Sequence, residues 1–198
     1  MHRVSGFLNL PDGQRFDPLP PGVVDFIEAG EAPVFVGFGS LTPKDDAHIE
    51  ETLEVIEGAI RRAGCRAIVQ GLAEPDAGTE SILHVGRLPH ARLFPRCAAI
   101  VHHAGAGTTQ TATRAGTPSV CVPHVADQFY WSRRLYELGV APKPLKRKHL
   151  NAKRLARRLS EVLASREFAA RCRSLAANMS NENGAKRAAD MIETLAGR

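Results

Sequence analysis

Two glycine-rich turns carry residue types that could bind a phosphate group. The first is Gly37-Phe38-Gly39-Ser40-Leu41-Thr42, and the second is His102-His103-Ala104-Gly105-Ala106-Gly107-Thr108-Thr109. Each turn follows an apolar run and precedes a helical pattern, so the free N–H groups of a helix start would face a bound anion. Imidazole and hydroxyl groups add further hydrogen-bond donors. We therefore predict that both turns contribute to a phosphate-binding site.

Neither turn matches the best-defined nucleotide motifs. No Gly-Lys-Ser/Thr follows either turn, which excludes a P-loop, and Gln110 stands where the dinucleotide fingerprint has Gly or Ala. A glycine-rich turn can also reflect only close packing of a helix on a sheet. His103 begins the second turn and is interpreted as a ligand-binding residue, whereas His102 is interpreted as a strand-end packing or hydrogen-bonding residue.

The elements that must position these turns alternate along the chain. We expect strands over 33–38, 67–69, 82–85, 98–102 and 119–122, helices over 43–63, 91–94 and 108–115, and a helical C-terminal third. Parallel strands need helical crossovers, so this alternation predicts an α/β fold, a Rossmann-like doubly wound parallel sheet with extra C-terminal helices. Ligands of such sheets bind beyond the carboxyl ends of the strands, where both turns fall.

The helix over 43–63 has the most complete local signals. Thr42 is a suitable N-cap and Pro43 suits the first helical position. Apolar residues recur at helical spacing and are expected to face the sheet: Ile49, Leu53, Ile56 and Ile60.

The chain of 198 residues is long enough for one large domain. Residues 1–22 are dense in Pro and Gly and are predicted to form an extended linker, with the folded domain over 23–198. No apolar stretch has the length of a membrane-spanning helix and the N-terminus lacks the pattern of a signal peptide, so we expect a cytoplasmic protein. The four cysteines form no CxxC pair and are interpreted as reduced, mostly buried thiols.

Positive charge is concentrated in one part of the chain. Thirteen Lys or Arg residues and three Glu residues lie between positions 133 and 173. A solvated helix face explains this bias most simply, and peripheral contact with an anionic membrane surface is the alternative. Few aromatic residues interleave with the charges and no nucleic-acid motif accompanies them, so we do not expect nucleic acid as a partner.

Four sequence blocks carry a resemblance to a known family. Between positions 85 and 131 they read Val-Gly-Arg-Leu-Pro-His, Ile-Val-His-His-Ala-Gly-Ala-Gly-Thr-Thr, Arg-Ala-Gly-Thr-Pro-Ser-Val-Cys-Val-Pro and Asp-Gln-Phe-Tyr-Trp. In order and approximate spacing they resemble the donor-binding signature of the family 1 glycosyltransferases. Together with the block from Val34 to Ser40, they look most like the sterol glucosyltransferase branch. The resemblance covers nearly the whole chain and implies the C-terminal, nucleotide-sugar-binding half of a GT-B fold.

The resemblance also implies which residues bind the donor. The diphosphate would be bound by residues of the two turns: His103, Gly105, Gly107 and Thr108, with Gly39, Ser40 and Thr109 close to it. The nucleobase would meet the backbone around Arg87 and Leu88, and the hexose hydroxyls would meet Asp127 and Gln128. Plant-type members have Glu on the ribose where this chain has Thr111, so the choice between UDP and TDP stays open.

Some of these positions have simpler interpretations. Asp127 is a favoured residue type for a helix N-cap and could serve only that purpose. Phe129, Tyr130 and Trp131 are interpreted as core or domain-interface residues rather than stacking platforms. His90 and His124 receive no role.

The implied reaction is inverting transfer of a hexose, from UDP-glucose in the first instance, to a sterol or other lipophilic hydroxyl. The UDP-sugar is a substrate, and no cofactor or metal is expected. Family members hold the acceptor pocket and the catalytic base in an N-terminal domain, so no catalytic residue is expected on this chain. We expect that domain, or a partner subunit, as a partner. Two alternatives stay open, a half-enzyme or non-catalytic subunit and a UDP-sugar epimerase relative.

Overall fold

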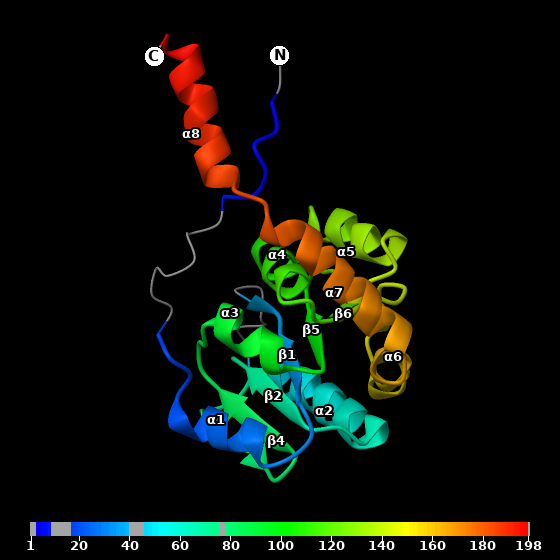
Figure 1. Ribbon diagram of the computed structural model, residues 1–198. Helices are drawn as coiled ribbons and strands as arrows, with labels where there is room; N and C mark the ends of the chain where they lie inside the picture. The colour runs from blue at the N-terminus through cyan, green and yellow to red at the C-terminus, as the bar shows by residue number, and fades with distance from the viewer. Residues whose placement is uncertain (1–2, 9–16, 40–45, 76–77, 198) are drawn as a thin grey trace.

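A six-stranded sheet forms the centre of the computed structural model, which describes residues 3–8, 17–39, 46–75 and 78–197 (Figure 1). The strands are β1 (Val34–Gly37), β2 (Ala67–Gln70), β3 (Gly78–Thr79), β4 (Ile82–Val85), β5 (Ala99–His102) and β6 (Ser119–Cys121). Their order is β3-β4-β2-β1-β5-β6, and all neighbouring pairs are parallel except the short edge pair β3–β4. The predicted α/β fold with a parallel sheet is confirmed.

Helices cover both faces of this sheet. They are α1 (Pro21–Glu28), α2 (Asp46–Ala63), α3 (His90–Leu93), α4 (Ala106–Arg114), α5 (Gln128–Glu137), α6 (Ala152–Leu163), α7 (Arg166–Ser180) and α8 (Gly184–Leu195), with short 3₁₀ turns at Phe94–Arg96 and Arg147–His149. The C-terminal third is helical, as predicted. Figure 1 shows α8 projecting beyond the sheet with residues 3–8 beside it, and the Phe7 amide donates to Glu182 Oε1 at 3.3 Å.

The alternation of side chains along β1 explains the two layers of helices. Val34 and Val36 point into the core cluster formed with α2 and α6, whereas Phe35 points into the opposite cluster with α1, α3 and α4. All three residues are almost completely buried. A strand covered on both faces needs apolar residues at every position, which is why β1 reads as a continuous apolar run.

The helix α2 packs its apolar stripe against the sheet. Ile56 and Ile60 are buried in the core, and Ile49 and Leu53 pack against it, as predicted. The expected helix start at Pro43 and its N-cap Thr42 lie outside the described residues.

Two helices differ from the sequence predictions, and the short edge strand β3 was not predicted. Helix α1 begins at Pro21 and places Val23 and Ile27 in the core, although no helix was expected there. Its signals were a Pro in the first turn and an apolar pair at i,i+4 spacing, but the segment is short and has no side-chain N-cap. Helix α4 begins at Ala106 rather than near Thr108, because Gly105 serves as its N-cap.

Candidate functional site

The two glycine turns meet at the carboxyl edge of the sheet. Gly37 of β1 pairs in register with His102 of β5, so the residues after each strand lie side by side. A methyl group on Gly39 would lie 2.8 Å from His103 Cε1, and one on Gly105 would lie 2.4 Å from His103 Nε2. The His103 ring therefore sits between the two turns, and only glycine leaves it that space. Ser40, predicted to lie close to the diphosphate, is outside the described residues.

Helix α4 presents an open N-terminus at this edge. Gly105 is its N-cap and makes no side-chain cap hydrogen bond, so the first N–H groups of the helix are not capped by a side chain. Gly107 is exposed, with nothing within 4 Å of a Cβ built there, and Thr108 is half-buried beside it. These groups and the positive end of the helix dipole form an arrangement that suits an anion.

The loop before α4 is held in an unusual conformation by His102. Ala104 has φ 63°, in the left-handed region that L-residues rarely adopt. His102 is completely buried, and its Nδ1 accepts a hydrogen bond from the Ala104 amide at 3.1 Å. Burial lowers the pKa of His102 to about 3, so the ring stays neutral and keeps this acceptor. The interpretation of His102 as a hydrogen-bonding strand-end residue is confirmed.

His103 differs from its neighbour because it is only half-buried. Burial lowers the pKa of His103, and the nearby Asp127 carboxylate opposes that effect. The ring is therefore neutral at pH 7 and can donate one N–H to a ligand. Its Nδ1 is buried and has no hydrogen-bond partner among the described residues. A buried polar atom without a partner is costly in a folded protein and marks a site where a ligand could complete the bonding.

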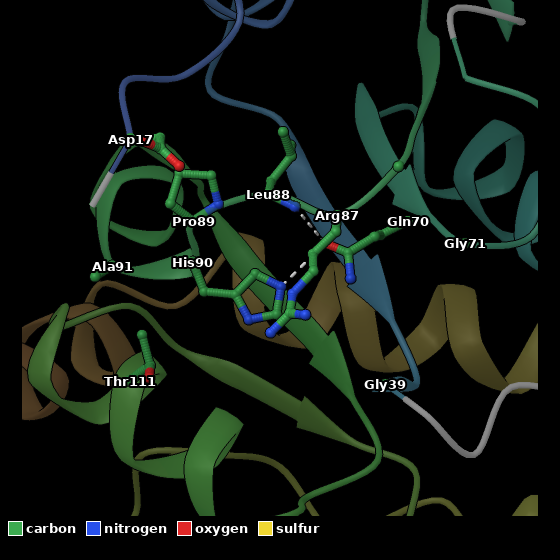
Figure 2. Close-up of a pocket in the computed structure, with 11 residues that line it drawn as sticks. Asp17, Gly39, Gln70, Gly71, Arg87, Leu88, Pro89, His90, Ala91 and Thr111 are labelled. Atoms are coloured by element: carbon green, nitrogen blue, oxygen red, sulfur yellow. Dashed lines mark hydrogen bonds between the residues drawn. The ribbon is translucent and has the colours of Figure 1, made fainter. Parts of the chain in front are cut away.

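A cavity of about 950 Å³ lies beside these turns, beyond the ends of β1, β2 and β4. Figure 2 shows Gln70, Arg87 and His90 gathered in it, with Thr111 of α4 facing them. Of the predicted donor residues, Gly39, Arg87 and Leu88 line this cavity. The cavity is large enough for a nucleotide-sized ligand.

Gln70 and His90 are cavity residues to which the sequence analysis gave no role. Gln70 Oε1 accepts from the Leu88 amide at 3.4 Å and lies 3.1 Å from His90 Nε2. His90 Nε2 must then carry the proton, and its ring stacks on Phe94 with centroids 4.5 Å apart. Burial, Arg87 and His103 lower the pKa of His90 to about 4. Gln70 ends β2, and that position at a strand's carboxyl end was the only sequence signal for it.

The hydroxyls of α4 point to different sides of the helix. Thr111 lines the large cavity, and its Oγ1 donates to the Gly107 carbonyl at 2.9 Å. Thr109 is 5% exposed and lines a separate cavity of about 140 Å³ between α4, α5 and α7. The structure therefore does not bring the Thr109 hydroxyl to the large cavity, because residues 109 and 111 lie on different faces of the helix.

The side chain of Gln128 fixes the loop before α5 by hydrogen bonds to its backbone. Its side-chain Oε1 accepts from the amides of His124 at 2.8 Å and Val125 at 3.1 Å, and the residue is 4% exposed. Asp127 is the residue before α5, but its side chain does not cap the helix and instead accepts from Trp131 Nε1 at 3.0 Å. Ala126 beside it has φ 50°. Strained residues gather at functional sites, and here Ala104 and Ala126 flank His103 and Asp127.

Two further expectations can be compared with the structure. Phe129 and Tyr130 are 45% and 62% exposed, so the expectation that they belong to the core is wrong, and the domain-interface alternative stays a prediction. The four cysteines are free, and all except the half-buried Cys65 are buried, as predicted. Within the described residues, no group of three His, Cys, Asp or Glu could hold a metal ion, and no helix is long and apolar enough to cross a membrane.

The fold defines an α/β domain of the GT-B type. The crystal structure of the glycotransferase of kitacinnamycin is similar to this one, with a TM-score of 0.71 and 21% sequence identity. The match covers 94% of this chain and 47% of the kitacinnamycin glycotransferase chain. The structure of Arabidopsis thaliana UGT89C1, solved in complex with UDP-L-rhamnose, has a TM-score of 0.70 and 20% sequence identity to this chain. That match covers 92% of this chain and 49% of the UGT89C1 chain. These likenesses establish the fold.

The family follows from the sequence comparison. The model of the Erythromycin biosynthesis protein CIII-like C-terminal domain matches residues 44–195, and the chain belongs to this family of glycosyltransferase domains. It is 36% identical to the sterol 3-beta-glucosyltransferase UGT80B1 of Arabidopsis thaliana, over 93% of this chain and 30% of the relative. It is 44% identical to the vancomycin aglycone glucosyltransferase of Amycolatopsis orientalis, over 69% of this chain and 32% of the relative. The chain thus spans about a third of the length of these relatives.

Proposed function

We propose that this domain binds a nucleotide-diphosphate sugar, UDP-glucose in the first instance, as the donor half of an inverting glycosyltransferase. The acceptor is a sterol or another lipophilic hydroxyl. The observation that carries the proposal is the open N-terminus of α4 beside His103 and the large cavity. An anion-binding helix start next to a nucleotide-sized cavity is what a nucleoside diphosphate needs.

Each part of the donor has a candidate partner in this arrangement. The base and ribose occupy the cavity beside Arg87, Leu88 and Thr111. The diphosphate lies against the first turn of α4 and His103. The hexose extends toward Asp127 and Gln128, where the Gln128 amide nitrogen makes no hydrogen bond with the described residues. The Leu88 amide already donates its hydrogen bond to Gln70 Oε1. A nucleobase that accepts from this N–H must therefore displace the Gln70 side chain.

This half of the enzyme acts on the leaving group. In inverting transfer, the acceptor hydroxyl loses a proton to a base while the anomeric carbon gains oxocarbenium character and the diphosphate leaves. Negative charge grows on the diphosphate, and preorganised N–H donors stabilise it more in the transition state than in the ground state. The α4 N–H groups and the neutral His103 ring supply those donors. The base and the acceptor pocket belong to a separate domain or a partner subunit.

Calorimetric titration tests donor binding directly. The chain is titrated with UDP-glucose and UDP, with TDP-glucose and NAD as comparators, and the His103→Ala variant is the control. We expect saturable binding of the UDP compounds and a loss of about tenfold or more in the variant, because a charge-assisted hydrogen bond disappears. Absence of binding to every nucleotide, or identical binding by the variant, contradicts the proposal.

A further inference from the structure

Five exposed cationic side chains gather at the start of α6, and we call them the α6 basic patch: Lys146, Lys148, Lys153, Arg154 and Arg157. Within the described part of the chain, none of them forms an ion pair with a carboxylate. Several cations on other helices are paired, since Arg133 and Arg134 share Glu137 and Arg171 meets Glu167, whereas others such as Arg62 and Arg173 are single charges without an ion pair among the described residues. The α6 basic patch is therefore distinguished by five unpaired cations within twelve residues, which leave a concentrated positive charge for an external partner.

The fold forces these side chains outward. Leu155, Leu159 and Val162 form the apolar stripe of α6 and are buried in the core next to α2. Figure 1 shows α6 lying beside α2, the helix with which it makes its main contact. Lys153, Arg154 and Arg157 occupy other faces of the helix and, with Asn151, line a hollow of about 450 Å³. Burial of one face thus presents the cations to solvent.

The patch is placed where cations do not stabilise a helix. Lys153 and Arg154 lie in the first turn of α6, at the positive end of its dipole, and that turn contains no acidic residue. Acidic residues are favoured at this position and cations are disfavoured. A local arrangement that opposes helix stability without a compensating ion pair points to selection for another role.

The segment that leads into the patch starts at the carboxyl edge of the sheet, where the candidate donor site lies. The Leu145 amide donates to the carbonyl of Cys121, the last residue of β6. From the next turn, the half-buried Arg147 reaches Thr52 Oγ1 at 2.5 Å and places its guanidinium carbon 5.8 Å from the Phe38 ring centroid, just after β1. Glu51 of α2 is the acidic side chain whose charge acts on Arg147. A surface bound at Lys146 and Lys148, which flank Arg147, would therefore lie near the donor site.

We infer that the α6 basic patch docks this domain on an anionic lipid membrane. The choice of a membrane rests on the proposed lipophilic acceptor, because such an acceptor resides in the bilayer and the patch would hold the donor site near it. Each Lys or Arg near an anionic bilayer contributes to binding, and the contribution falls within a Debye length. Nucleic acid is disfavoured, since no Phe, Tyr or Trp lies between positions 146 and 158 to stack on bases.

Vesicle co-sedimentation at low salt tests this inference. The chain is mixed with phosphatidylcholine vesicles that contain or lack phosphatidylglycerol. The test variant is Lys153→Glu/Arg154→Glu/Arg157→Glu, and the matched control Arg62→Glu/Arg166→Glu/Arg173→Glu reverses three other exposed cations. We expect binding only to the acidic vesicles, a loss of about 100-fold in the test variant, and a much smaller loss in the control. Added salt weakens the binding.

Two further measurements make the outcomes decisive. Thermal unfolding shows that the test variant is folded, and we expect no loss of stability because acidic residues suit the start of α6. Calorimetry with UDP is performed on each variant, so failure of the proposed donor function is recorded separately from failure of docking. No binding of the unmodified chain to acidic vesicles overturns the inference, as does an equal loss in both variants. Retention of RNA or DNA without vesicle binding overturns it in favour of a nucleic-acid partner.

Discussion

At the scale of single residues, the two glycines at the start of α4, Gly105 and Gly107, differ in the space around them. Gly105 allows a close approach, because a Cβ there would lie 2.4 Å from Nε2 of the His103 ring and would force that ring to move. Gly107 has open space around it, so the fold does not require glycine there. A ligand that approaches the backbone closely is then the reason to keep Gly107 without a side chain.

This contrast predicts the behaviour of Gly107→Ala. Alanine favours a helix over glycine by up to about 1 kcal/mol, so the variant should unfold at the same temperature as the unmodified chain or higher. Its affinity for UDP should fall about tenfold or more, because the methyl group occupies the space of the diphosphate and prevents its hydrogen bonds. Thermal unfolding and calorimetry check both effects.

The matched control is Gly22→Ala in α1, because a Cβ built at Gly22 also has no atom within 4 Å. If Gly107→Ala binds UDP as tightly as this control does, the proposed placement of the diphosphate is wrong.

His102 predicts a pH dependence of stability. Its pKa falls from 6.5 in the unfolded chain to about 3 in the folded one, so the unfolded state binds more protons between these values. Its contribution to stability is complete above about pH 6.5 and decreases as the pH falls, by up to about 1.4 kcal/mol per pH unit. Protonation of Nδ1 would also remove the acceptor of the Ala104 amide.

Urea unfolding between pH 7 and pH 5 measures this slope. Gln in place of His102 offers an acceptor that does not titrate, so we expect a shallower loss of stability with acid in His102→Gln. The exposed His149 provides the control His149→Gln, which should keep the slope of the unmodified chain. Equal slopes in all three proteins would show that His102 does not control the acid sensitivity.

At the scale of secondary-structure elements, two helices share one capping device in different surroundings. Asn151 caps α6 by accepting from the Arg154 amide, and Asn183 caps α8 by accepting from the Lys186 amide, both at 3.0 Å. Helix α6 buries Leu155 and Leu159 in the core, whereas Gly184 is the only residue of α8 that is buried. The two caps should therefore affect different unfolding events.

Asn151→Ala should lower the free energy of global unfolding by about 1 kcal/mol, because the lost cap destabilises a helix of the core. Asn183→Ala should leave global unfolding unchanged, because α8 can fray without exposing the core. Chemical unfolding measures the first effect, and amide hydrogen exchange in α8 measures the second. Equal destabilisation of global unfolding by both changes would mean that α8 unfolds cooperatively with the sheet.

The elements also show what the sequence could predict. Long, periodic helices and apolar strands were predicted within a few residues, because α2 and β1 carry a pattern that burial imposes directly. Helix α1 was missed because its eight residues are stabilised by tertiary contact of Val23 and Ile27 rather than by local signals. The motif could not predict that Thr109 and Thr111 line different cavities, because a motif fixes sequence spacing, whereas the start of the helix decides which face each residue occupies.

At the scale of the whole molecule, the proposed donor function gives the described residues the leaving-group side of the reaction. The histidines nearest the cavity are poor general bases, since the pKa of His90 is about 4 and that of His103 is lowered by burial. Asp127 is exposed and accepts a hydrogen bond from Trp131. General base catalysis needs a group with a suitable pKa within hydrogen-bond reach of the acceptor hydroxyl. In the proposed reaction these residues act on the leaving group, and we expect another domain or a partner to provide the base.

The polypeptide of 198 residues should therefore bind UDP-glucose but transfer negligible glucose to a sterol or another lipophilic alcohol. Mass-spectrometric detection of glycoside, with a full-length glucosyltransferase as the positive control, checks this expectation. Addition of an acceptor-binding domain should restore transfer, since it provides the base and excludes water from the cleft. Glycoside formation by the polypeptide alone contradicts the assignment of the base to another domain. Conversion of the UDP-sugar to an isomer without any acceptor would instead favour the epimerase alternative, because that reaction needs no acceptor hydroxyl.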